Sequence, residues 1–112
     1  MAETFENIDA PEAIELASGS AVLVDVRESW EWNSGHAPQA ISLPMSQLEE
    51  RYSELDQDAT LLIICHSGQR SLSVADALTR AGYTAINVVG GMMAWQASGG
   101  DVVVESSEPP HV

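Results

Sequence analysis

The sequence predicts a single α/β domain with a central, mostly parallel sheet of about five strands and helices on both faces. Two observations lead to this fold class. Short β-branched runs alternate with amphipathic segments along the chain, which is typical of parallel strands that are joined by helices. The chain has 112 residues, of which 45% are hydrophobic, so it is long enough and apolar enough to form one core.

The first half of the chain contains two predicted strands. Asp9 suits the N-cap of a helix, and Gly19 suits its end. The apolar side of this helix is expected to carry Ile14, Leu16 and Ala17. Residues 21–26 form a β-branched run that predicts a buried strand, and residues 40–43 predict a second, short strand. Between these strands, residues 28–34 predict a short helix or turn.

The second half contains the most apolar predicted strand. Residues 60–64, Thr-Leu-Leu-Ile-Ile, predict a strand that is covered on both faces. Before it, Ser46 and Glu49 have the spacing of a helix-capping box. The apolar residues at helical spacing near this box are Leu48, Tyr52 and Leu55. Residues 70–81 predict a longer helix, and residues 85–89 predict a further strand. The apolar positions of that helix are Leu72, Val74, Ala75, Leu78 and Ala81.

The last part of the chain contains paired glycines and a polar end. Gly90 and Gly91 predict a turn into a final helix over residues 92–97. Residues 1–99 are therefore assigned to the domain. Residues 100–112 are assigned to a flexible acidic C-terminal tail.

The charge of the chain is strongly negative and excludes several classes of partner. There are 17 acidic residues and four basic ones, for a formal net charge of −13. Four basic side chains cannot neutralise many phosphates, and nucleic-acid binding is therefore not expected. An anionic membrane surface would repel the chain. The longest apolar run, residues 61–65, is too short to cross a membrane. The N-terminal residues lack a secretory pattern and Cys65 is a single cysteine, so a reduced, cytoplasmic setting is expected.

Cys65 is the residue best suited to chemistry. It follows the apolar strand directly, and four residues separate it from Arg70 at the start of the next helix. In open α/β sheets, such a loop lies at the carboxyl ends of the strands, where sites form. A loop this short can direct successive backbone N–H groups at one sulfur atom, and the helix N-terminus further favours the reactive thiolate. Gly68 permits positive φ, and Arg70 could bind an oxyanion.

Less specific interpretations remain open for the cysteine and its neighbours. A lone cysteine at the end of an apolar strand is often only a small buried hydrophobe. His66 could be a base for the thiol, but adjacent side chains on a curled loop often point apart, which favours a solvent-facing or substrate-facing residue. A metal site of Cys65, His66 and His36 lacks any standard ligand spacing. Neither a metal nor an organic cofactor is implied by the sequence.

Four motifs, in order, resemble the single-domain members of the rhodanese-like sulfurtransferases. Residues 25–28, Asp-Val-Arg-Glu, resemble the Asp-x-Arg signature of that family, and residues 35–40 resemble its Gly-His-Ile-Pro-Gly-Ala segment. Residues 65–70 are similar to its active-site loop, Cys-x-x-Gly-x-Arg, and residues 90–95 resemble its closing Gly-Gly…Trp pattern. The resemblance covers roughly residues 4–99 and implies a three-layer rhodanese-like fold.

That resemblance implies a sulfurtransferase that moves a sulfane sulfur from thiosulfate or a similar small anionic donor. Cys65 would accept the outer sulfur as a persulfide, and cyanide, a small thiol or a protein thiol, such as that of a thioredoxin-like protein, would remove it. Arg70 would bind the donor, and Asp25 and Arg27 would mainly support the loop and strand ends. The thiolate and persulfide would be held by the loop amides of His66, Ser67, Gly68, Gln69 and Arg70.

Two alternative functions remain open. Cysteine phosphatases and arsenate reductases also place a cysteine before a loop and an arginine at a helix start, but with five residues between them, whereas Cys65 and Arg70 are separated by four. A smaller ring of amides fits one sulfur better than a tetrahedral phosphate. The second alternative is a rhodanese fold that serves as a regulatory or protein-binding module, because fold does not fix function. The three tryptophans are interpreted as packing residues, His36 as a hydrogen-bonded turn residue, and the acidic cluster within 49–58 as a solvated face.

Overall fold

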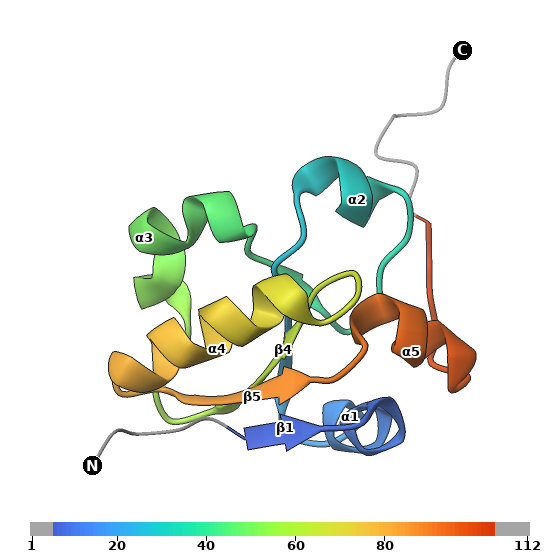
Figure 1. Cartoon of the computed structure of the whole chain (residues 1–112), viewed down its shortest axis with the longest axis horizontal. Helices are drawn as coiled ribbons and strands as arrows, with labels where there is room; N and C mark the ends of the chain where they lie inside the picture. The colour runs from blue at the N-terminus through green and yellow to red at the C-terminus, as the bar shows by residue number, and fades with distance from the viewer. Residues whose placement is uncertain (1–5, 105–112) are drawn as a thin grey trace.

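A parallel sheet of five strands runs through the centre of the molecule (Figure 1). The structure is a computed structural model that describes residues 6–104. The strands follow the order β1-β5-β4-β2-β3, and every neighbouring pair is parallel. Their bounds are β1 (Glu6–Ile8), β2 (Val22–Asp25), β3 (Ile41–Ser42), β4 (Thr60–Ile64) and β5 (Thr84–Val88). The predicted class, an α/β domain with a mostly parallel sheet of about five strands, is confirmed.

Helices cover both faces of this sheet. The helical elements of the described residues are α1 (Ala10–Ala17), α2 (Ser29–Asn33), η1 (Met45–Gln47), α3 (Leu48–Arg51), η2 (Tyr52–Glu54), α4 (Gln69–Arg80) and α5 (Gly91–Ala97). As Figure 1 shows, α1 and α5 lie against one face, and α4 lies against the other with α3 beside it. α2 follows the carboxyl end of β2 and lies near the loop between β4 and α4. No helix in this part of the chain has the length and apolar character needed to cross a membrane.

Alternation along β4 divides the core into two halves. Leu62 and Ile64 pack on the side of α1 and α5. Leu61 and Ile63 pack on the side of α4, and so does Cys65, one position beyond the strand. Because helices cover both faces, every residue from 61 to 65 is buried, as the continuous apolar run predicted. The same alternation turns the thiol of Cys65 toward α4.

β1 was not predicted from the sequence. It has only three residues, of which Ile8 alone is buried, so its pattern does not differ from that of a polar loop. Its place at the edge of the sheet comes from pairing with β5, where Glu6 lies opposite Ile86 and Ile8 lies opposite Val88. An edge strand this short is specified by its partner more than by its own side chains.

The helix caps and faces differ in part from expectation. Oδ1 of Asp9 accepts a hydrogen bond from the Glu12 N–H at 3.0 Å, so the predicted N-cap of α1 is confirmed. The predicted capping box of Ser46 and Glu49 is wrong, because Ser46 lies in η1 and α3 begins after Gln47. The Ser46 hydroxyl instead donates to Oε1 of Glu28 at 2.8 Å.

The predicted apolar faces of two helices are also partly wrong. Leu16 of α1 and Leu72 of α4 are 36% and 40% exposed. The buried positions of α1 are Ala10, Ala13 and Ala17. Those of α4 are Ser71, Val74, Ala75, Leu78 and Thr79. Small residues allow α1 to approach the sheet closely, so Leu16 is turned outward although it is more hydrophobic than the buried alanines.

Residues 101–104 lie against the body of the domain. His36 and Val103 form an antiparallel bridge, with N···O distances of 2.9 and 2.8 Å. Val102 packs against the core on the side of α1 and α5. These contacts hold the first part of the predicted acidic tail, and the remainder, residues 105–112, lies outside the described residues.

Candidate active site

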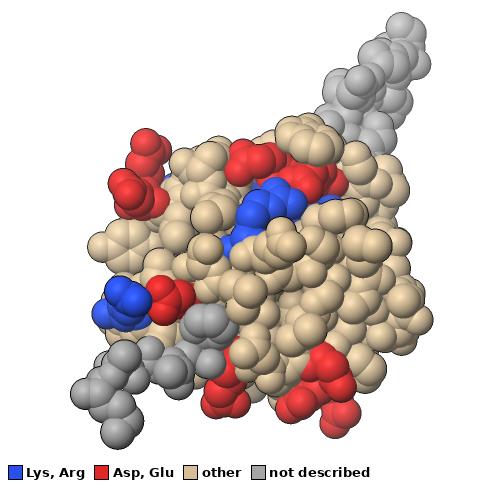
Figure 2. All heavy atoms as spheres, viewed as in Figure 1, with Lys and Arg blue, Asp and Glu red and all other residues tan. Residues whose placement is uncertain are grey.

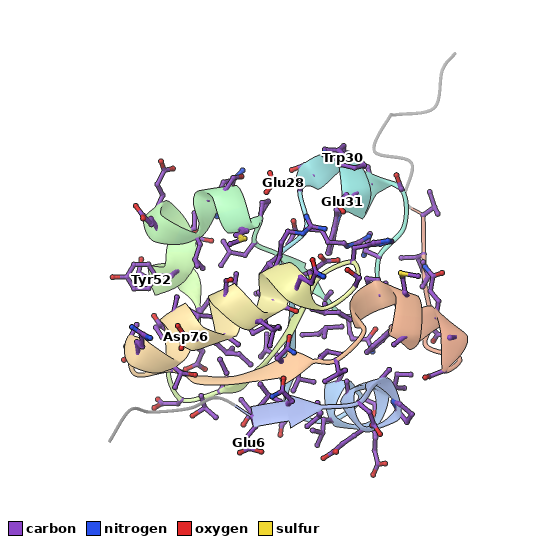
Figure 3. All side chains as sticks on the ribbon, viewed as in Figure 1. Glu6, Glu28, Trp30, Glu31, Tyr52 and Asp76 are labelled. Carbon is purple, nitrogen blue, oxygen red and sulfur yellow. The ribbon has the colours of Figure 1, made fainter. Side chains whose placement is uncertain are left out.

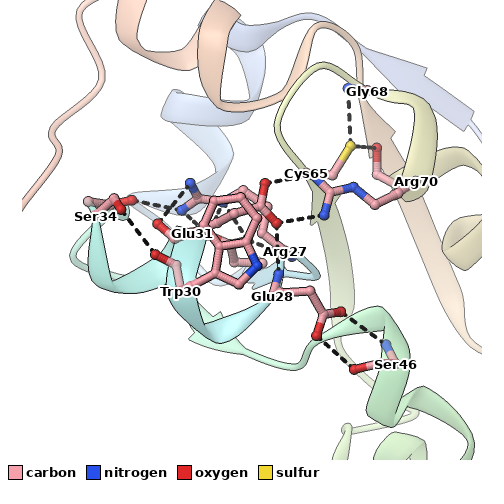
Figure 4. A network of polar contacts seen from close by, with 12 residues as sticks. Arg27, Glu28, Trp30, Glu31, Ser34, Ser46, Cys65, Gly68 and Arg70 are labelled. Atoms are coloured by element: carbon pink, nitrogen blue, oxygen red, sulfur yellow. Dashed lines mark hydrogen bonds and ion pairs between the residues drawn. The ribbon is translucent and has the colours of Figure 1, made fainter.

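The end of β4 places Cys65 in a tight loop that leads into α4 (Figure 4). Gly68 ends this loop at the N-cap of α4 with φ of 103°, a left-handed conformation that glycine adopts without steric strain. The Gly68 N–H donates to Sγ of Cys65 at 3.1 Å. In the first turn of α4, the Ser71 hydroxyl oxygen lies 3.3 Å from the same sulfur. The sulfur therefore lies among hydrogen-bond donors from both the loop and the helix.

These donors change the acidity of the thiol. Burial of Cys65, which is 1% exposed, by itself raises the pKa of the thiol. Hydrogen bonds from the hydroxyl and N–H of Ser71, and from the N–H groups of Gly68 and Arg70, act in the opposite direction and outweigh burial. The pKa of Cys65 is therefore lowered from its ordinary value. Because the thiolate is the nucleophile, this environment favours the reactive form of the sulfur.

Three other residues of the predicted site are exposed, namely His66 and Ser67 of the loop and Gln69, the first residue of α4. Ser71 was not identified as a site residue from the sequence, although its side chain is fully buried. A serine in the first turn of a helix is common, and only the packing of α4 against Cys65 distinguishes this one. The single signal in the sequence is its spacing of six residues from the cysteine.

The paired glycines hold the opposite side of the loop. At the start of α5, the Met92 N–H donates to the Cys65 carbonyl at 2.7 Å, and the Met93 N–H donates to the His66 carbonyl at 3.1 Å. Gly91 has φ of 57°, and a Cβ placed on it would come within 2.6 Å of the His66 carbonyl carbon. A side chain at this position would therefore push α5 away from the loop.

Asp25 and Arg27 form a buried ion pair beside the loop. Nη2 of Arg27 lies 2.7 Å from Oδ2 of Asp25, and Nε lies 3.0 Å from Oδ1. Arg27 also donates to the carbonyl of Gly35 at 2.8 Å and to that of Glu31 at 3.4 Å. Since these carbonyls belong to α2 and to the segment that follows it, the pair ties α2 to the end of β2.

Arg70, which was predicted to bind an anionic donor, is already paired with a carboxylate. Its Nη1 and Nη2 donate to Oε1 and Oε2 of Glu31 at 2.7 and 2.8 Å (Figure 4). The hydrogen bonds from Arg70 are the main reason that the pKa of Glu31 is lowered to about 2, so this carboxylate stays ionised at neutral pH. Glu31 was not identified from the sequence, because it lies 39 residues from Arg70 and no local pattern joins the two.

The surface around this pair is mixed in charge. Figure 2 shows a small arginine area between α2 and α4, bordered by acidic side chains. In Figure 3, Glu28, Trp30 and Glu31 all project from the region of α2. The acidic border therefore comes from α2, which the Asp25–Arg27 pair holds in place.

A cavity of about 370 Å³ opens beside the loop. Trp30 on its border is 72% exposed, and Met93 is 58% exposed. The lining residues are Arg27, Trp30, Glu31, Ser34, Gly35, His66, Met92, Met93 and Gln96. Of the other two tryptophans, Trp95 is fully buried, and Trp32 stacks on His36 with 3.6 Å between ring centroids. Within residues 6–104, no group of three or more His, Cys, Asp or Glu side chains is arranged to hold a metal ion.

The sequence and the fold both match known proteins. The family model described as "Rhodanese-like domain" matches residues 9–98. The chain is 43% identical over 74 residues to "Putative sulfurtransferase YtwF" of Bacillus subtilis (strain 168), which covers 66% of this chain and 72% of that protein. It is 34% identical over 91 residues to "Putative sulfur carrier protein YrkF" of the same strain. That second match covers 80% of this chain but only 45% of the relative.

Solved structures share the fold over most of the chain. A rhodanese-related protein from Thermoplasma volcanium superposes with a TM-score of 0.85 at 31% identity, covering 90% of this chain and 100% of that one. A rhodanese-like domain protein from Staphylococcus aureus superposes with a TM-score of 0.79 at 30% identity, covering 91% of this chain and 100% of that one.

Proposed function

The chain belongs to the rhodanese-like domain family, and on that basis we propose that it is a sulfurtransferase that carries the transferred sulfur as a persulfide on Cys65. The observation that carries this proposal is the environment of the sulfur. Sγ of Cys65 receives the Gly68 N–H at 3.1 Å and lies 3.3 Å from the Ser71 hydroxyl oxygen. A structural cysteine in an apolar core needs no such donors, whereas a thiolate or a persulfide anion does.

The reaction consists of two displacements at sulfur. The Cys65 thiolate attacks the outer sulfur of thiosulfate or a related donor, a new S–S bond forms, and the old bond breaks so that its electron pair leaves with sulfite or a thiolate. An acceptor nucleophile, such as a thiol or cyanide, then attacks the outer sulfur of the persulfide and returns Cys65 to the thiolate. The donors around Sγ stabilise the anion at each stage.

Two features support a thiol acceptor in a reduced, cytoplasmic setting. Cys65 is a free cysteine, and a reducing compartment would keep it so. The relatives named as a sulfurtransferase and as a sulfur carrier are consistent with transfer to another molecule, such as a small thiol or a thioredoxin-like protein. Because the chain spans only 45% of the sulfur carrier, the partners of that whole protein need not be shared.

The direct test is a change of mass. The protein is incubated with thiosulfate, or with a small alkyl persulfide, and its intact mass is measured before and after addition of a thiol. We expect the wild-type protein to gain the mass of one sulfur atom and to lose it to the thiol, while Cys65→Ser gains nothing. Absence of the adduct with both donors would contradict the proposal and favour a binding module. An adduct that persists in Cys65→Ser would place the chemistry elsewhere.

A further inference from the structure

Both arginines near the thiol are matched by carboxylates. Arg27 is paired with Asp25, and Arg70 is paired with Glu31 through both of its terminal nitrogens. The site therefore presents no net positive charge from these side chains. The whole chain has a formal net charge of −13, which repels anions at long range. A dianion such as thiosulfate gains little from charge at this site.

Glu31 is held in place and is not an incidental surface contact. Its Oε1 also accepts the Glu28 N–H at 3.0 Å. Its carbonyl oxygen lies 3.4 Å from Nη1 of Arg27, which fixes this turn of α2. The Glu31 side chain is 12% exposed, and its pKa of about 2 keeps it ionised across the neutral range. To reach both Nη atoms of Arg70, an anionic donor must displace this carboxylate.

The rest of the cavity suits an organic group. Trp30 and Met93 line it and are 72% and 58% exposed. These side chains offer polarisable apolar surface that can contact the carbon skeleton of a thiol. Thiosulfate has no such skeleton, whereas an alkyl persulfide has one and carries at most one negative charge on its sulfur.

We propose that Glu31 is a specificity-determining residue, which occupies Arg70 and thereby favours low-charge persulfide donors over dianionic donors such as thiosulfate. The proposal rests on the function proposed above. In the favoured step, the Cys65 thiolate attacks the outer sulfur of R–S–SH. The Cys65–sulfur bond forms, the R–S bond to that sulfur breaks with its electron pair, and the products are Cys65–S–SH and the thiolate R–S⁻. No oxidant or reductant is consumed.

The test compares two donors in matched variants. The rate of persulfide formation on Cys65 is measured with thiosulfate and with an alkyl persulfide whose alkyl group carries no charge. Each rate is then divided by the rate at which the same donor reacts with a small thiol in the absence of the protein. For Glu31→Gln, we expect the thiosulfate-to-persulfide ratio of kcat/KM to rise by about tenfold, because Arg70 becomes available to the dianion. Glu31→Asp retains the charge and should restore a low ratio.

The control variant is Glu54→Gln. It removes the same charge from another Arg–Glu pair, in which Arg51 is the last residue of α3 and Glu54 is the last residue of η2. We expect its ratio to equal that of the wild type. The proposal would be overturned if the thiosulfate-to-persulfide ratio of Glu31→Gln were equal to or lower than that of the wild type. It would also be overturned if Glu54→Gln raised the ratio as much as Glu31→Gln does.

A measurement on the wild type does not depend on the folding of any variant. After the same normalisation, we expect the wild-type protein to use the alkyl persulfide at least about tenfold better than thiosulfate. Equal or better use of thiosulfate would overturn the specificity proposal while leaving sulfur transfer intact. If no donor places sulfur on Cys65, the proposed function itself fails, and the role of Glu31 fails with it.

Discussion

The Asp25–Arg27 and Glu31–Arg70 pairs have the same chemistry in different surroundings. Both carboxylates meet a guanidinium at 2.7 Å. The side chains of Asp25 and Arg27 are 0% and 7% exposed, whereas those of Glu31 and Arg70 are 12% and 35% exposed. The first pair joins residues two apart at the end of a strand, and the second joins two elements 39 residues apart. Water cannot replace either partner of a buried ion pair, so such a pair holds two parts of the structure together. At the border of a cavity, a ligand can replace one of the two partners.

The largest expected difference between the pairs is in stability. Arg27→Met leaves the Asp25 carboxylate buried without its partner, and we expect a loss of about 3–5 kcal/mol in the free energy of unfolding. Arg70→Met leaves a carboxylate that water can reach, and we expect a loss of about 1 kcal/mol or less. Denaturant unfolding of both variants measures the two values. Equal losses would show that exposure does not separate the two pairs.

A second test asks what stabilises the thiolate when both arginines are paired. If local hydrogen bonds do, Ser71→Ala should raise the pKa of Cys65 and slow its alkylation at neutral pH by about three- to tenfold. The alkylation rate is followed as a function of pH. Ser73→Ala makes the same change at an exposed position of α4 and should behave as the wild type. A normal profile for Ser71→Ala would mean that the hydroxyl does not contribute.

The Glu31–Arg70 pair should also leave a signature in the pH dependence of stability. The pKa of Glu31 is about 2 in the folded protein and 4.5 as an ordinary carboxyl, so its contribution is complete above about pH 5 and is lost as the pH falls toward 2. Near neutral pH, we expect the free energy of unfolding of the wild type to exceed that of Glu31→Gln by about 1 kcal/mol. The free energies of unfolding of the wild type and of Glu31→Gln, measured from pH 6 downward, should converge. A constant difference between them would show that the carboxylate charge does not cause the difference in stability.

The smallest expected effect is that of salt. Moderate salt screens the long-range repulsion between a chain of net charge −13 and a dianion, so kcat/KM for thiosulfate should rise by about twofold. The alkyl persulfide should respond less because it carries less charge. Steady-state rates at several ionic strengths provide the measurement. A steady fall of kcat/KM for thiosulfate would indicate that attraction to Arg70 dominates despite Glu31.

Much of the fold could be predicted because its signals are local. The strand at β4, its continuous apolar run and the helix after Gly68 follow from residues that are neighbours in the chain. β1 could not be predicted, since three residues with one buried side chain obtain their strand geometry from β5. Leu16 was placed on the wrong side of α1, because packing selected small alanines for the close contact.

The sequence by itself was enough to indicate the candidate loop. The order of a strand, Cys65, Gly68 and Arg70 within six residues is enough to identify a loop that can hold a sulfur anion, because backbone donors that are close in the chain are also close in space. The charge that this loop presents to a ligand was decided only by the tertiary structure. Glu31 reaches Arg70 because α2 follows the carboxyl end of β2 and lies near the loop between β4 and α4 (Figure 1). An electrostatic contact between elements depends on distance in space, which no local pattern of residues encodes.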